Sequence, residues 1–140
     1  MPLSSDHEIA NLLADTHTIA VIGVPDRPGT APYEVASYQQ SQGYRLFPIN
    51  DQEKTVLGFQ AKASLSDIRE PIDVVDVFAS PEDVPAIADA AIQARAKALW
   101  LQPGAHHPEA VRKAEAAGLT VVTDKCFMKE HRRLLSDLPM

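Results

Sequence analysis

The chain of 140 residues contains one cysteine, Cys126, so it cannot form an internal disulfide. Chains of this kind are typical of reducing compartments, and we therefore expect a cytoplasmic protein. Its longest apolar run is about seven residues, whereas a membrane-spanning helix needs roughly 20. The first eight residues have neither a basic nor an apolar region, so we expect no secretory signal and no contact with a membrane.

Basic residues are in the minority. There are 13 Lys and Arg against 19 Asp and Glu, which gives a formal net charge of −6. Nucleic-acid-binding proteins need a basic surface, so nucleic acid is not an expected partner. A small anionic ligand is still compatible, because a helix dipole and one or two cations can hold a phosphate. The 45% of hydrophobic residues is ordinary for a globular chain, and we expect one domain over residues 1–140.

Common catalytic and metal-binding motifs are missing. The chain has no Gly-x-Ser-x-Gly, no Walker A sequence and no His-Glu-x-x-His. His106 and His107 are adjacent, so their side chains point in different directions, and no Cys or His pair with ligand spacing accompanies them. We therefore expect no bound metal, and a binding protein rather than an enzyme.

Short apolar runs rich in β-branched residues alternate with helical patterns along the chain. The runs are residues 18–24, 45–49, 73–78, 98–101 and 119–123. Helices are expected from Ser5, over residues 33–42, after an N-cap at Ser80, and from His107 to Gly118; residues 54–59 are expected to form a small turn or edge element. This alternation predicts an α/β protein with a Rossmann-like, doubly wound, parallel five-stranded sheet and helices on both faces. By analogy with dinucleotide-binding folds we expect the strand order 3-2-1-4-5.

Ligands of such sheets bind beyond the carboxyl ends of the strands, which directs attention to the loop after the first strand. Gly23 begins this loop, Pro25 takes the place of a second glycine, and Pro32 suits the first turn of the next helix. Backbone N–H groups at that helix start favour a phosphate, and Arg27 could add a charged contact. The alternative is a rigid turn without a ligand.

A nicotinamide dinucleotide is an alternative ligand. NAD-binding sheets usually carry an acidic residue at the end of the second strand, where it holds the ribose. Here that strand ends at residues 48–50 and Asp51 follows. A minimal NAD(P)-binding, oxidoreductase-like domain is therefore one alternative function, and an interaction module with an unused cleft is another.

Five segments at strand ends together resemble a known family. The segments are residues 23–33, 48–50, 75–78, 100–104 and 124–126. The chain is similar to the stand-alone CoA-binding domain proteins, and hence to the N-terminal CoA-binding domain of the succinyl-CoA synthetase α subunit. The resemblance implies a small protein that holds coenzyme A or an acyl-CoA at the strand ends. The synthetase's catalytic histidine lies in a second domain, so synthetase activity is not expected here.

The resemblance also implies where the ligand contacts lie. The first loop would hold the pyrophosphate through Gly23, Val24, Arg27, Thr30 and Pro32. The ends of the second and third strands would hold the adenosine through Pro48, Asn50, Phe78 and Ser80. Gln102 and Gly104 would face the pantetheine arm. Asp26 departs from the family, which often has a serine nearby, and would bring a negative charge close to a phosphate.

Lys125 and Cys126 follow the last strand, about 15 Å from the second if three strand spacings separate them. An extended CoA could direct its thiol towards them. Lys125 and a helix start near Phe127 could make the Cys126 thiol reactive, so that under oxidising conditions it could form a mixed disulfide with CoA. The simpler interpretation, which we favour, is a buried cysteine that packs as a small apolar group.

Asp76 interrupts an apolar strand. A buried carboxylate must find hydrogen-bond donors or a cation. Asp76 could orient a binding loop, but we favour a structural role, with bonds to the backbone at a neighbouring strand end.

Overall fold

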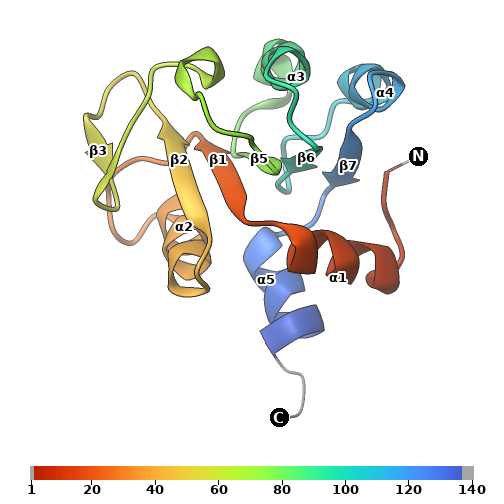
Figure 1. Cartoon of the computed structure of the whole chain (residues 1–140), viewed down its shortest axis with the longest axis horizontal. Coiled ribbons are helices and arrows are strands. Elements are labelled where there is room, and N and C mark those ends of the chain that lie inside the picture. The colour runs from red at the N-terminus through yellow and green to blue at the C-terminus, as the bar shows by residue number, and fades with distance from the viewer. Residues whose placement is uncertain (1, 137–140) are drawn as a thin grey trace.

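The computed structural model describes residues 2–136, and a five-stranded parallel sheet forms its centre (Figure 1). The strands are β1 (Thr18–Ile22), β2 (Arg45–Ile49), β5 (Val74–Val77), β6 (Ala98–Leu101) and β7 (Thr120–Thr123). Every residue of β5 and β6 is buried, as expected for strands covered on both faces. The predicted α/β, doubly wound, Rossmann-like class is confirmed.

Helices cover both faces of the sheet (Figure 1). The helices α1 (Asp6–Asp15), α2 (Ala31–Ser41) and α5 (Phe127–His131) lie on one face. The helices α3 (Val84–Gln93) and α4 (Pro108–Ala116) and the short 3-10 helix η1 (Leu65–Asp67) lie on the other. Each face has its own apolar core, and Trp100 and Phe127 are the largest fully buried side chains of the first.

The strand order is β2-β1-β5-β6-β7, so the expected order 3-2-1-4-5 is wrong. The third main strand, β5, lies between β1 and β6 rather than outside β2. The place outside β2 is already taken, because Lys62 N–H donates to the Pro48 carbonyl (2.9 Å) and Asn50 N–H donates to the Lys62 carbonyl (2.8 Å). The observed order is the other common doubly wound arrangement, and its switch point falls between β1 and β5.

The segment that covers β2 contains a small hairpin. Its strands are β3 (Thr55–Val56) and β4 (Phe59–Gln60), which pair in antiparallel fashion. This hairpin confirms the expected extra element at residues 54–59. Its tip is fixed to the first loop, because Leu57 N–H donates to Asp26 Oδ1 (3.2 Å). Asp26 is therefore engaged with the protein's own backbone.

Most helix ends follow the predicted caps. Ser5 Oγ accepts a bond from Glu8 N–H, and His107 Nδ1 accepts one from Ala110 N–H, each at 3.1 Å. Ser80 lies at the predicted N-cap position and Pro81 follows it, but the Ser80 side chain makes no capping bond and the element that begins there is a 3-10 turn, η2 (Pro81–Asp83), which precedes α3. Within residues 2–136, no helix is both long enough and apolar enough to span a bilayer.

Candidate functional site

The carboxyl ends of all five strands lie at one edge of the sheet, which we call the carboxyl edge. The first loop meets the loop after β5, which we call the third loop, at the switch point between β1 and β5. Gly23 has a φ of +88°, and a Cβ at this position would lie 2.0 Å from the Phe78 carbonyl oxygen. Only glycine permits this approach, because any side chain would collide with the Phe78 backbone and strain the Gly23 backbone.

The first loop is held in shape by bonds within itself and to the start of α2. Thr30 Oγ1 donates to the Arg27 carbonyl (2.9 Å), and Gly29 N–H donates to Glu34 Oε1 (3.0 Å). Pro32 lies in the first turn of α2 and has no N–H. The Arg27 side chain is exposed beside this helix start. The loop therefore presents one cation and the positive end of a helix dipole to a ligand, whereas the Gly29 N–H is already bonded.

Asn50 joins the end of β2 to the first loop. Its Nδ2 donates to the Val24 carbonyl (3.1 Å), and its Oδ1 accepts from the N–H groups of Gln52 (2.7 Å) and Glu53 (3.1 Å). Val24 is buried. The side chains of Asn50 and Val24 are thus committed to the protein, and they shape the loop.

A hollow of about 440 Å³ opens beside this junction, and we call it the β2-side hollow. Its lining residues are Gly23, Pro25, Ile49, Asn50, Asp51 and Ala63. A second hollow of about 480 Å³ lies further along the carboxyl edge, and we call it the β7-side hollow. Its lining residues are Pro81, Gly104, His106, Thr123 and Asp124. The two hollows lie on opposite sides of the switch point.

The loop after β7 is anchored by Trp100. The indole Nε1 donates to the Lys125 carbonyl at 2.7 Å, while the rest of the ring is fully buried. Cys126 is half-buried at the start of α5 and packs against the Trp100–Phe127 core. Trp100 therefore acts as a core residue, as predicted, and also sets the position of Lys125 and Cys126.

Gln102 is turned inward. Its side chain is 3% exposed, and its Nε2 donates to Asp76 Oδ1 at 2.7 Å. Gln39 Nε2 of α2 donates to Asp76 Oδ2 at 2.9 Å. The expected backbone partners of Asp76 at a neighbouring strand end are therefore wrong, because side-chain amides from an adjacent helix and loop reach the carboxylate instead. Asp76 is fully buried, and burial raises its pKa to about 6, although bonds from Gln102, Gln39 and Val77 N–H lower it.

Sequence reasoning missed Gln39. The available signal was its position on α2, where Val35, Ala36 and Gln39 share the buried face. A fully buried polar residue on an otherwise apolar helix face needs a polar partner in the core. That partner is Asp76, the one carboxylate within the apolar strand β5, which accepts from Gln39 Nε2.

The strand order also changes how the predicted ligand contacts are grouped. Pro48 and Asn50 lie on one side of the first loop, and Phe78 and Ser80 lie on the other, because β1 separates β2 from β5. Four strand spacings, about 19 Å, separate β2 from β7, where the expected order implied three. The carboxyl edge is thus longer than the sequence suggested.

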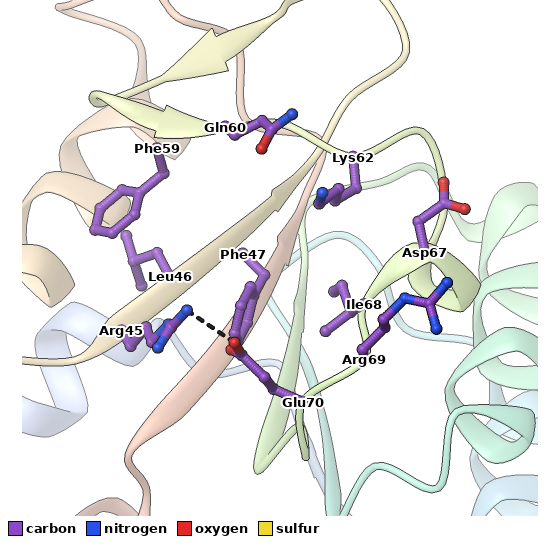
Figure 2. A pocket seen from close by; sticks show the side chains of 10 residues that line it. All are labelled: Arg45, Leu46, Phe47, Phe59, Gln60, Lys62, Asp67, Ile68, Arg69 and Glu70. Atoms are coloured by element: carbon purple, nitrogen blue, oxygen red, sulfur yellow. Dashed lines mark hydrogen bonds and ion pairs between the residues drawn. The ribbon is translucent and has the colours of Figure 1, made fainter.

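A separate pocket of about 330 Å³ lies on the flank of β2 (Figure 2). Arg45 closes one side by pairing with Glu70 Oε1 (3.0 Å), and its guanidinium lies 5.2 Å from the centre of the Phe47 ring. Phe59, Lys62 and Arg69 are among the other lining residues. This pocket contains none of the site residues predicted from the sequence, so we place the candidate site at the carboxyl edge.

The sheet order, the close packing of Gly23 at the switch point and the helix start beside Arg27 define a class. They are features of doubly wound, Rossmann-like α/β domains that bind ligands at the carboxyl edge. Comparison with known proteins identifies the family: residues 17–132 match the model for the CoA binding domain, and the chain belongs to this CoA-binding domain family. The match covers every predicted site residue, and the resemblance seen in the sequence is confirmed.

Individual proteins and solved structures are also similar to this chain. The chain is 35% identical over 127 residues to the uncharacterized protein YneT of Bacillus subtilis, covering 91% of this chain and 94% of that protein. A solved structure from Thermus thermophilus, cell-free ID.343, superposes with a TM-score of 0.90 at 36% identity over 94% of this chain and all of that one. An acetyl-coenzyme A synthetase of Candidatus Korarchaeum cryptofilum shares the fold over 76% of this chain and 26% of its own, at 21% identity and a TM-score of 0.69.

Proposed function

We propose that this protein binds coenzyme A, or an acyl-CoA, in an extended form along the carboxyl edge. Membership of the CoA-binding domain family is the observation that carries the proposal. The arrangement of the edge supports it: an extended ligand that begins in the β2-side hollow and ends in the β7-side hollow must cross the first loop. The proposed role is binding, in the cytoplasm and without a catalytic set.

The pyrophosphate belongs at the first loop in this proposal. Arg27 is exposed there, and the first N–H groups of α2 have no partner within the helix. Together they provide a positive charge and backbone donors, which is the combination that favours a phosphate group. Gly23, Val24, Thr30 and Pro32 shape this loop rather than supply charge.

The two ends of the ligand occupy different hollows. The adenosine lies towards Pro48 and Asn50, and Phe78 and Ser80 border the middle of the ligand. Gly104 borders the pantetheine arm in the β7-side hollow. Lys125 and Cys126 lie beyond it, on the side that the thiol end approaches. The Gln102 side chain is buried beneath this hollow, so it supports the loop rather than contacting the ligand.

A second candidate is a dinucleotide such as NAD(P). The observation that favours it is the position of Asp51, which lines the β2-side hollow and could accept bonds from ribose hydroxyls. NAD carries neither the 3′-phosphate nor the pantetheine arm of CoA, so a comparison of ligands separates the two candidates.

The decisive experiment is a thermal-shift and calorimetric comparison of CoA, acetyl-CoA, dephospho-CoA, NAD, NADP and ADP. The protein is first denatured and assayed for co-purified nucleotide. A ligand at 100 times its Kd stabilises by about 2.7 kcal/mol, which amounts to several degrees in Tm. We expect a shift with CoA and none with NAD. A shift with NAD or NADP and none with CoA overturns the proposal.

Arg27→Ala tests the placement of the pyrophosphate. The loss of one charge-assisted contact should weaken CoA binding by about tenfold and leave the Tm of the free protein unchanged. Arg69→Ala is the matched control, because it removes the same charge from an exposed arginine in the flank pocket of Figure 2. Equal loss of affinity in both variants would show a general charge effect instead of a contact at the first loop.

A further inference from the structure

A buried polar cluster lies directly beneath the carboxyl edge. It consists of Asp76 on β5, Gln39 on α2 and Gln102 in the loop after β6, and none of the three is more than 3% exposed. Both amide Nε2 groups donate to the carboxyl group, one to each oxygen, at 2.9 and 2.7 Å. Asp76 therefore links these three elements through its two carboxyl oxygens.

The bond to Gln102 fixes a turn that lines the β7-side hollow. Gln102 N–H donates to the Val77 carbonyl (3.1 Å), and the Gln102 carbonyl accepts from Ala105 N–H (3.0 Å). Gly104, which lies between Gln102 and Ala105 in this turn, has a φ of +92°. The backbone and the side chain of Gln102 are thus both held by β5, and the turn from Gln102 to Ala105 has its position set from below.

We propose that Asp76 is a positioning residue for ligand binding: its buried carboxylate holds Gln102, and through it the turn that faces the pantetheine end of the ligand, while Gln39 ties the same carboxylate to the helix that begins at the first loop. This inference rests on the proposed function. In this proposal the buried Asp76 side chain connects the first-loop side of the carboxyl edge, through Gln39, with the turn that lines the β7-side hollow, through Gln102.

The charge of Asp76 is what makes these bonds strong. Burying a carboxylate is costly, and an apolar residue would fill this place at a lower free-energy cost. A bond to a carboxylate is roughly twice as strong as a bond between neutral groups. The free-energy cost of the buried charge is therefore offset by firm placement of the two amides.

Within residues 2–136, no cation acts on the Asp76 carboxylate. The raised pKa of Asp76 comes from burial, and its three hydrogen bonds only partly offset this. Titratable side chains on the helices that cover this face have other partners or lie at the surface. On α2, Glu34 accepts from Gly29 N–H and Tyr38 bonds to His131; on α5, Glu130 pairs with Arg133 and Lys129 is exposed. On α1, Asp6 pairs with Arg133, Glu8 accepts from Ser5, His7 bonds to Asn11 and Asp15 is exposed. Burial is therefore the main cause of the raised pKa of Asp76.

A protonated form can be accommodated in the same space. Gln39 Oε1 is buried and has no hydrogen-bond partner among the described residues. If the Gln39 amide turns over, this oxygen can accept a bond from a protonated Asp76. Asp76 would then donate to Gln39 Oε1 and still accept from Gln102 Nε2, but neither bond would be assisted by charge.

The test compares wild type with Asp76→Asn, which mimics the protonated carboxyl, by titration calorimetry with dephospho-CoA from pH 5 to pH 8. This ligand lacks the 3′-phosphate, whose own titration would obscure the profile. At pH 8 we expect about fivefold weaker binding in the variant, because charge-assisted bonds become neutral. The two proteins should converge at pH 5. An equal Kd at every pH overturns the proposal.

Asp73→Asn is the matched control. Asp73 is a second carboxylate of the same sheet, just before the amino end of β5, where it accepts from His17 N–H (2.8 Å) and Thr18 N–H (3.1 Å). Its replacement should lower the Tm and leave the Kd unchanged. An effect of Asp73→Asn on the Kd equal to that of Asp76→Asn would show that general loss of stability, not positioning, weakens binding.

Amide hydrogen exchange provides a measurement that needs no ligand. Exchange at Gln102 and Ala105 should accelerate in Asp76→Asn and in Gln102→Met, which keeps the length and burial of the side chain but loses the donor. Gln102→Met also serves if Asp76→Asn does not fold. Unchanged exchange overturns the positioning role whatever binds, and faster exchange with an unchanged Kd reduces Asp76 to a structural support. Failure of wild type to bind CoA or dephospho-CoA instead overturns the proposed function.

Discussion

Gly23 shows how a single residue determines the geometry of the carboxyl edge. It lies where the first and third loops touch, and its missing side chain allows the Phe78 carbonyl to approach. The position of the two loops relative to each other therefore depends on this glycine.

At the residue scale we expect Gly23→Ala to destabilise the fold by about 2–4 kcal/mol, because a backbone collision adds to the strain of a positive φ. CoA binding should weaken with it. Gly29→Ala is the control: its φ is +93°, but no atom lies within 4 Å of the added Cβ, so only the strain of about 1 kcal/mol applies. Urea unfolding of both variants measures the difference, and equal losses would contradict the collision.

Side-chain partners at this scale were only partly predictable. The resemblance to the CoA-binding domain proteins pointed to Asn50 and Gln102, and both lie at the carboxyl edge. Their partners within the protein could not be predicted: Asn50 Nδ2 donates to the Val24 carbonyl, and Gln102 Nε2 donates to Asp76. These pairs are 26 residues apart in each case, and no local pattern joins them.

At the element scale, Asp73 joins neighbouring strands at the amino ends of the sheet, opposite the carboxyl edge. Its carboxylate accepts bonds from two N–H groups where β1 begins, and Lys97 Nζ lies 3.4 Å away, just before β6. Burial raises the pKa of Asp73, but these partners lower it more, so the net pKa is below its ordinary value. The starts of β1 and β6 are thus joined through the Asp73 carboxylate, whose charged form is favoured by these partners.

The sign of the pH effect follows from this shift. A carboxylate whose folded-state pKa is depressed stabilises the fold above its unfolded pKa of 3.8, and this contribution is lost as pH falls through the folded pKa. We expect Asp73→Asn to lower the unfolding free energy by about 1–2 kcal/mol at pH 7. The gap between variant and wild type should shrink below pH 3.8. Denaturant titrations at several pH values measure it, and a gap that widened in acid would contradict the assignment.

Elements were predicted better than their ends. The five main strands and the helices between them follow from apolar runs and caps, and His107 and Gly118 mark the ends of α4 as expected. The turn after β5 differs, because Ser80 leads into a 3-10 turn and the helix begins at Val84. The difference is a few residues at one helix start, where several polar residues compete as caps.

At the scale of the whole molecule, the extended carboxyl edge should produce a graded ligand footprint. We expect ADP to slow hydrogen exchange only in the first loop and at the end of β2. CoA should in addition protect residues 102–106 and 124–126, because its pantetheine arm continues towards β7. Exchange measured by mass spectrometry with each ligand tests this. Identical footprints for ADP and CoA would place the arm in solvent.

The sequence by itself determined the fold class and the family, since periodicity, caps and strand-end motifs are local patterns that any stretch of chain carries with it. It did not determine the strand order or the partners of Asp76. β5 pairs with β1 in the central part of the sheet, while the segment around Lys62 pairs with the outer edge of β2. Gln39 and Gln102 reach one carboxylate only after α2 and β6 have packed beside β5. Such pairings depend on competition between distant segments for the same edge or the same donor, which only the tertiary structure decides.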